Sequence, residues 1–123
     1  MKMKKTLLIG ALISSTIMFG QTFTDGGINY NVTSVANKTA EVHFNEGISG
    51  PVVIPEEVTY SSAKYTVTAV GYWAFGRTKI TSISMPSSVT RVDSTSFYEC
   101  LGLTNVTLSQ NVTFIGASAF EGC

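Results

Sequence analysis

The amino-acid sequence predicts a β-rich solenoid with an N-terminal β-hairpin as its cap. In such a fold short parallel strands stack in successive coils, and we expect an irregular convex side with short helical turns. Two observations carry the prediction. A pattern of apolar residues recurs every 22 or 23 residues in the second half of the chain, and internal repeats of this length are typical of stacked repeat architectures. The segment before the repeats alternates apolar and polar residues instead, as the strands of a hairpin do.

Residues 1–20 predict a secretory signal peptide. Three lysines at positions 2, 4 and 5 precede an apolar run over 7–19, which is the typical order of such a segment. The run is shorter than the roughly 20 apolar residues that a membrane-spanning helix needs, so an uncleaved membrane anchor is the less favoured alternative. Cleavage would leave a net charge of 5 − 8 = −3. We therefore expect an exported chain without a membrane span, and without the basic surface that nucleic acid requires.

Residues 21–48 predict the hairpin cap. Apolar and polar residues alternate over 28–34, a second extended run covers 39–44, and residues 35–38 can form the turn between them. A repeat array needs such a cap, because the apolar face of its first coil must be shielded from water.

Residues 49–123 predict the repeats, and each copy contains two apolar blocks. The first block is a pair of aliphatic residues followed by a small residue and a phenylalanine, which is Phe75, Phe97 or Phe120. The second block has the spacing L-x-x-L-x-L, as in Ile80–Met85 and Leu103–Leu108. Its last two apolar residues lie two apart and therefore share one face of a strand. This is the pattern of a leucine-rich repeat.

An earlier partial copy covers residues 52–58, and nine extra residues separate it from the next one. We interpret this insertion, centred on residues 61–64, as a hairpin loop. The pattern stops at Cys123 in the middle of a coil, so we expect the array to be truncated there.

The repeats resemble the bacterial surface-antigen, BspA-like class of leucine-rich repeats. Residues 112–123 read Val-Thr-Phe-Ile-Gly-Ala-Ser-Ala-Phe-Glu-Gly-Cys, and residues 103–108 read Leu-Thr-Asn-Val-Thr-Leu. The chain departs from the family pattern at Ser109, where proline is usual, and at Asp93, where glycine is usual. The resemblance implies an exported or surface-exposed protein that takes part in adhesion.

The strand blocks also predict a binding surface. Polar side chains alternate with the buried ones and must point outward from the strands. These residues are Ser82, Ser84, Asn105 and Thr107, and Thr81 and Thr104 beside them extend the polar face. Trp73 is a further candidate, because an exposed tryptophan can anchor a protein or a sugar. Packing of Trp73 against the nine-residue insertion is the alternative.

Other residue types give no catalytic, cofactor or metal site. His43, the only histidine, alternates with apolar neighbours and should point outward from its strand. Glu56 and Glu57 are adjacent on an extended segment and point apart. Cys100 and Cys123 lie 23 residues apart at the same repeat position. They could form a disulfide, but we favour a ladder of buried thiols.

We therefore expect a secreted or cell-surface leucine-rich-repeat protein that is not an enzyme and that needs no cofactor. It would bind an extracellular protein or glycan ligand, of the host matrix or of other cells. Two alternatives stay open at this point. The chain could be a non-catalytic repeat module of a larger secreted enzyme, or a structural component of a surface layer.

Overall fold

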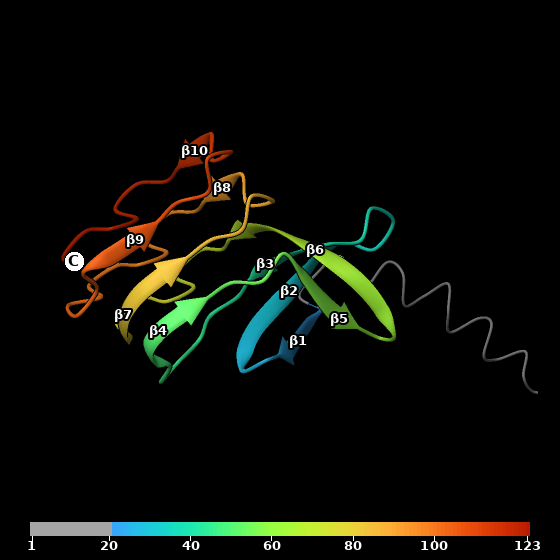
Figure 1. Cartoon of the computed structure of the whole chain (residues 1–123), viewed down its shortest axis with the longest axis horizontal. Helices are drawn as coiled ribbons and strands as arrows, with labels where there is room; N and C mark the ends of the chain where they lie inside the picture. Colours follow the sequence, from blue (N-terminus) through green and yellow to red (C-terminus); the bar gives the residue numbers. More distant parts are fainter. Residues whose placement is uncertain (1–20) are drawn as a thin grey trace, which may run out of the picture.

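The computed structural model describes residues 21–123 and folds them into two β-sheets (Figure 1). The strands are β1 (Thr22–Asp25), β2 (Ile28–Ser34), β3 (Thr39–Val42), β4 (Ser49–Val53), β5 (Glu57–Tyr60), β6 (Ala63–Val70), β7 (Lys79–Ser84), β8 (Arg91–Val92), β9 (Asn105–Thr107) and β10 (Phe114–Ile115). No helix long and apolar enough to cross a membrane occurs in this range. The predicted signal peptide lies outside the described residues.

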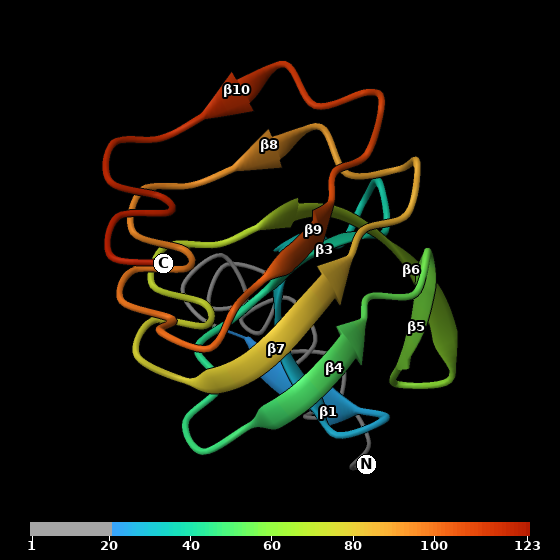
Figure 2. The same ribbon diagram turned by 60° about the vertical axis from the view of Figure 1, so that its left-hand side comes forward.

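The L-x-x-L-x-L blocks form one parallel sheet in the order β4-β7-β9. Ile83 of β7 pairs with Val52 of β4 on one side and with Val106 of β9 on the other. Equivalent repeat positions are therefore direct neighbours, as the spacing of the pattern predicts. In Figure 2 these three strands run side by side across the front of the molecule.

The aliphatic pair before each phenylalanine forms a second parallel ladder. Val42 of β3, Val70 of β6, Val92 of β8 and Ile115 of β10 follow one another in register. The seven-stranded sheet that contains them has the order β1-β2-β3-β6-β8-β10, with β5 paired to β6. Each copy of the pattern thus passes once through each sheet. We call such a passage a coil: β3–β4, β6–β7 and β8–β9 form the first three, and β10 begins the fourth.

The turns from the first sheet to the second contain no helix, so the prediction of short helical turns is wrong. Between β6 and β7, the N–H groups of Ala74, Gly76 and Thr78 donate to carbonyls three residues earlier, at 3.1 to 3.2 Å. Trp73 and Arg77 adopt φ angles of 60° and 58°. A residue in the left-handed region cannot continue a right-handed helix, so two of them within five residues prevent a helix from forming here.

This turn geometry repeats in the second, third and fourth coils. Thr95 and Ser118 occupy the position of Trp73, and Glu99 and Gly122 that of Arg77, all at positive φ. Successive turns are joined as well, because the N–H of Phe75 donates to the carbonyl of Ser96 at 2.7 Å. The left-handed positions therefore belong to the repeat and do not depend on one residue type.

The phenylalanines form a single column through the core. The ring centroids of Phe75 and Phe97 lie 5.4 Å apart with an interplanar angle of 14°, and those of Phe97 and Phe120 lie 5.0 Å apart at 4°. Phe75 and Phe97 are fully buried, and Phe120 is partly buried. Each ring therefore covers the face of the ring in the preceding coil.

The two cysteines are free thiols in this column of coils. The Cys100 thiol is buried and donates to the carbonyl of Phe75 at 2.9 Å, and the Cys123 thiol donates to the carbonyl of Phe97 at 3.1 Å. Partial burial raises the pKa of the Cys123 thiol. The buried-thiol prediction fits Cys100, but it is wrong for Cys123, which is exposed.

The N-terminal hairpin forms where the alternating pattern predicts it. Strands β2 and β3 pair in antiparallel fashion, with Val32 opposite Ala40. Strand β1 adds a third antiparallel strand, which the sequence pattern did not reveal. Strand β3 also pairs in parallel with β6, so it takes part both in the hairpin and in the ladder of coils. The boundary at residue 48 between cap and repeats stays a prediction.

A buried asparagine fastens the hairpin to the coils. The Oδ1 of Asn45 accepts from the N–H of Asn29 at 2.8 Å, and its Nδ2 donates to the carbonyl of His43 at 2.6 Å. Its own N–H donates to the carbonyl of Ala74 in the next coil at 2.8 Å. One side chain, only 3% exposed, thus joins β2 to the end of β3.

The nine-residue insertion is a hairpin, which confirms the sequence prediction. Strands β5 and β6 pair in antiparallel fashion around Ser61 and Ser62, both at positive φ, as a two-residue hairpin turn requires. The hairpin contacts the N-terminal strands: the Phe23 and Tyr60 rings lie 4.8 Å apart, and Asp25 accepts from the N–H of Thr59 at 2.8 Å. The insertion therefore holds β1 in place.

Candidate binding surfaces

The predicted polar residues of the strand blocks lie together on one face. Thr81, Ser82 and Ser84 belong to β7, while Asn105 and Thr107 belong to β9 and Thr104 directly precedes it. Ser82 pairs with Asn105, and Ser84 pairs with Thr107. We call this surface, extended by Pro51 and Val53 of β4, the strand face.

The strand face is ordered and uncharged. Its side chains form two rows across the sheet, Pro51–Ser82–Asn105 and Val53–Ser84–Thr107. Thr81 and Thr104 lie next to these rows, and the backbone N–H of Thr104 donates to the carbonyl of Thr81 at 3.0 Å. Hydroxyl and amide groups on a rigid sheet can exchange hydrogen bonds with a ligand at little cost in conformational entropy.

Trp73 lies away from the strand face, in the turn between β6 and β7. Its ring stacks on that of Tyr98 in the next coil, with the ring centroids 5.4 Å apart, and the centroid of the Tyr72 ring lies 6.4 Å from it. The half-buried Trp73 does not pack against the insertion, as the alternative interpretation proposed. The seven predicted residues therefore belong to two separate surfaces.

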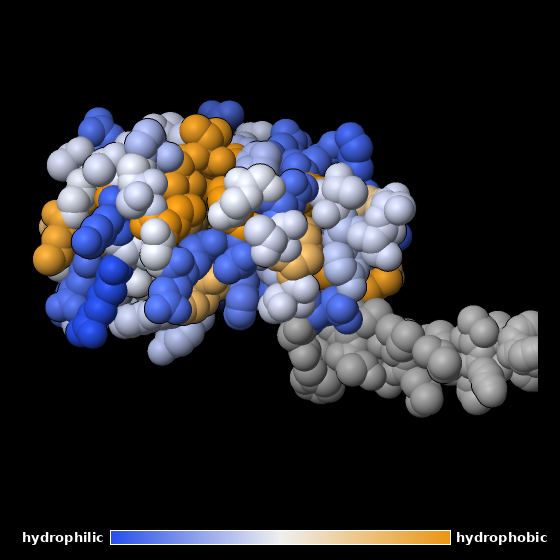
Figure 3. Space-filling view, turned by 90° about the horizontal axis from the view of Figure 1, so that it is seen from below, coloured by the Kyte–Doolittle hydropathy of each residue, from blue (hydrophilic) through white to orange (hydrophobic). Residues whose placement is uncertain are grey.

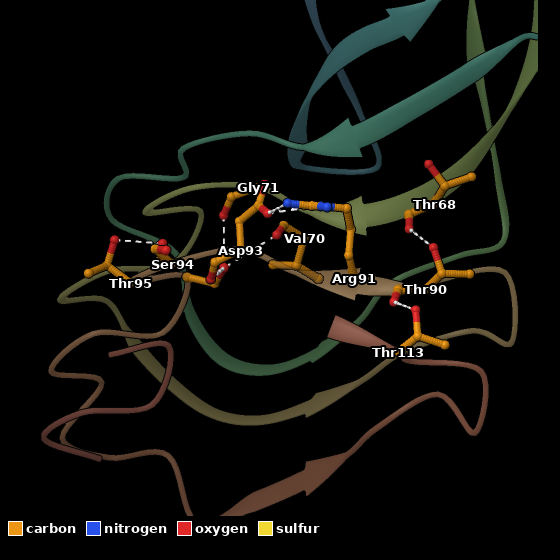
Figure 4. Close-up of polar contacts among 10 residues, drawn as sticks. Thr68, Val70, Gly71, Thr90, Arg91, Asp93, Ser94, Thr95 and Thr113 are labelled. Carbon is orange, nitrogen blue, oxygen red and sulfur yellow. Dashed lines mark hydrogen bonds and ion pairs between the residues drawn. The ribbon is translucent and has the colours of Figure 1, made fainter. Parts of the chain in front are cut away.

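A third surface, which is polar, follows β6, β8 and β10. It was not predicted from the sequence. The hydroxyls of Thr90 and Thr113 each donate to the carbonyl of the threonine one coil earlier, Thr68 or Thr90, at 3.4 Å (Figure 4). Beside them Arg91 donates to Asp93 at 2.9 Å and lies over the ring of Phe114 at 4.5 Å. The signal was available, because threonine follows the first valine in every copy.

Apolar surface is also accessible. Seen from below, hydrophobic residues form a central band between hydrophilic areas (Figure 3). Among residues 21–123, the large apolar side chains that are exposed are Val35, Phe44, Val53, Tyr72, Leu101, Val106, Leu108, Phe114 and Ile115. Tyr72 and Leu101 lie in the turns of consecutive coils, so apolar surface there adjoins the Trp73–Tyr98 stack.

The other candidates from the sequence do not gather into a site. His43 is exposed at the end of β3, as predicted. Glu56 and Glu57 are both exposed, and Glu57 forms a 3.8 Å ion pair with Lys64 across the β5–β6 hairpin. Within residues 21–123, no three of the side chains that bind metals come together.

Comparison with known proteins decides the family. The model of the "BspA type Leucine rich repeat region" matches residues 55–123 with six copies. This range is more than half of the chain. The chain belongs to the BspA-type leucine-rich repeat family.

Solved structures of leucine-rich repeat proteins are similar to this BspA-type chain. A leucine-rich cell surface protein of Faecalibacterium prausnitzii has 31% identity and a TM-score of 0.72, over 84% of this chain and 28% of its own length. A leucine-rich repeat protein of Bacteroides capillosus has 30% identity and a TM-score of 0.73, over 80% and 73%. The chain thus spans less than a third of the F. prausnitzii protein.

A more distant structure supports the fold alone. The pneumococcal vaccine antigen PcpA is 22% identical, with a TM-score of 0.64 over 84% of this chain and 30% of its own. A search of curated protein sequences finds no match. The two relatives named above with 30% identity or more are described as leucine-rich proteins, one of them a cell surface protein.

Proposed function

We propose that this BspA-type chain is a secreted or cell-surface binding protein that acts in adhesion without a catalytic step. Its coils form a solenoid, and the hairpin of β1, β2 and β3 caps the first coil. Export through the signal peptide predicted for residues 1–20 delivers it to the outside of the cell. Its ligand is a protein or a glycan of the extracellular surroundings.

The regular arrangement of side chains on the strand face is the observation that supports this proposal most. Serine, threonine and asparagine side chains repeat at paired positions of β7 and β9, and charged groups are absent from the two rows. Such a face offers many similar contacts, each of them weak. Binding that is spread over several coils gains affinity from the number of simultaneous contacts.

The first test is a charge placed on the strand face. Ser84 lies between Val53 and Thr107, so Ser84→Arg puts a long cation at the centre of one row. We expect it to weaken binding to the ligand that the screen identifies by tenfold or more, because the arginine side chain keeps the ligand away from the sheet. Solid-phase binding to fibronectin, laminin, collagen and a glycan array measures the effect.

Thr113→Arg on the third polar surface is the matched control, since it adds the same charge on the other sheet. Circular dichroism should show the same fold for both variants, because surface substitutions usually change stability by less than about 0.5 kcal/mol. The absence of any ligand after this screen, or equal loss with both variants, would contradict the proposal.

A further inference from the structure

The turns of the second and third coils carry an aromatic ledge that the fold does not require. We define the ledge as Tyr72, Trp73 and Tyr98. Tyr72 is 68% exposed, and the stack of Trp73 on Tyr98 at 5.4 Å holds the indole next to it. Large exposed aromatic side chains in contact with one another are typical of recognition surfaces.

Comparison between coils separates the demands of the fold from those of the ledge. The N–H of Trp73 donates to the carbonyl of Ser94, and the N–H of Thr95 donates to that of Ala117. These bonds align Tyr72 with Ser94 and Ala117. They also align Trp73 with Thr95 and Ser118. Small residues therefore satisfy the same turn in later coils, at the same left-handed φ.

Gly76 completes the ledge. A Cβ atom at this position would come within 2.7 Å of the Trp73 indole, so a larger residue would lift the ring from the turn. Its equivalent in the next coil is Tyr98, which supplies the second ring of the stack. The arrangement is therefore specific to the second and third coils.

A groove with an excess of positive charge adjoins the ledge. Its volume is about 380 Å³ and its lining residues are Arg77, Thr78, Lys79, Glu99, Leu101 and Gly102. Arg77 connects the two features, because its guanidinium lies 6.0 Å from the centre of the Tyr98 ring and 2.6 Å from a Glu99 oxygen. Two cations thus stand against one carboxylate, which favours an anionic group in the groove.

We propose that the ledge and the groove together bind an acidic oligosaccharide, such as a chain with uronic acids. One sugar ring stacks on Tyr72 and Trp73, and a neighbouring carboxylate reaches Arg77 and Lys79. Aromatic faces suit the C–H faces of sugar rings, and guanidinium groups suit carboxylates. This inference rests on the proposed binding function. It assigns a ligand class, acidic oligosaccharides, to the ledge, which is separate from the strand face.

Trp73 is the only tryptophan of the chain, so its fluorescence reports directly on the ledge. We expect hexagalacturonate or a hyaluronan hexasaccharide to change the emission of the full chain, and the neutral cellohexaose to bind at least tenfold more weakly. Tyr72→Ser, which installs the residue of the next coil, should weaken binding about tenfold and leave the melting temperature unchanged. Raised salt should weaken binding further, because the carboxylate contact is electrostatic.

Thr113→Arg, which adds a charge on the sheet of β6, β8 and β10 outside both the strand face and the ledge, should keep full affinity for the acidic sugars. Equal binding of cellohexaose, unchanged affinity in Tyr72→Ser, or tighter binding of a polyglutamate peptide overturns the ledge proposal. If matrix or glycan-array binding still depends on Ser84 in that case, the proposed function stands without the ledge. If neither surface binds any of these probes, both proposals fail.

Discussion

Replacement of Phe97 by alanine is expected to lower the free energy of unfolding by about 3–5 kcal/mol. The ring is fully buried between Phe75 and Phe120, at 5.4 and 5.0 Å from their centroids. Its removal exposes apolar surface on both neighbours and opens a cavity between two coils. This is a large share of the roughly 5–15 kcal/mol that stabilises a typical domain. Urea unfolding followed by circular dichroism measures the loss.

Leu101→Ala is the matched control for Phe97→Ala. Leu101 is 80% exposed in the turn of the same coil, so its truncation should change stability by less than about 0.5 kcal/mol. Similar losses in the two variants would mean that the phenylalanine column does not stabilise the coils.

Replacement of Asn45 by alanine is expected to cost about 1–3 kcal/mol, because it leaves buried polar groups without partners. The N–H of Asn29 and the carbonyl of His43 each lose a bond to this side chain. The loss should be local: amide hydrogen exchange of β2 should accelerate more than that of β7. Hydrogen exchange followed by mass spectrometry resolves the two strands.

Asn37→Ala provides the comparison for Asn45→Ala. Asn37 is exposed in the β2–β3 turn, and its hydrogen bond to the Ser34 hydroxyl uses the backbone N–H, which alanine retains. It should leave exchange in β2 unchanged. Equal acceleration of β2 and β7 in Asn45→Ala would show that the asparagine does not fasten the hairpin specifically.

The hairpin and the strand face could be predicted because they follow from alternation alone. Residues 28–34 alternate apolar and polar, and the buried and accessible positions of β2 alternate in the same way over most of its length. Ser82 and Ser84 of β7 follow from the same rule, since they flank the buried Ile83 and neighbours on a strand point to opposite faces. The nine-residue insertion was visible because it interrupts a regular spacing.

The second ladder and the turns could not be predicted in this way. Strands β8 and β10 have only two residues each, too few for a periodic signal. Trp73, Thr95 and Ser118 adopt left-handed backbone conformations although residues of these types rarely do so. At Trp73 and Thr95 this geometry is accompanied by hydrogen bonds between coils, whose partners lie 21 or 22 residues further along the chain.

The ledge shows the same limit for the candidate site. Trp73 was a visible candidate, but its stacking partner Tyr98 belongs to the next coil. The glycine under the indole also gave no signal in the sequence, since its effect depends on how close the ring lies to the turn. A side chain at a variable repeat position can therefore be placed only after the register between coils is known.

Ring-to-ring NMR contacts test most directly whether successive copies stack one on another. The rings of Phe75, Phe97 and Phe120 can be assigned by single substitutions in a chain with labelled phenylalanine. We predict nuclear Overhauser contacts from Phe97 to both other rings, and none between Phe75 and Phe120. Contacts between Phe75 and Phe120, or none from Phe97 to either ring, would contradict the stacking on which the strand face and the ledge both depend.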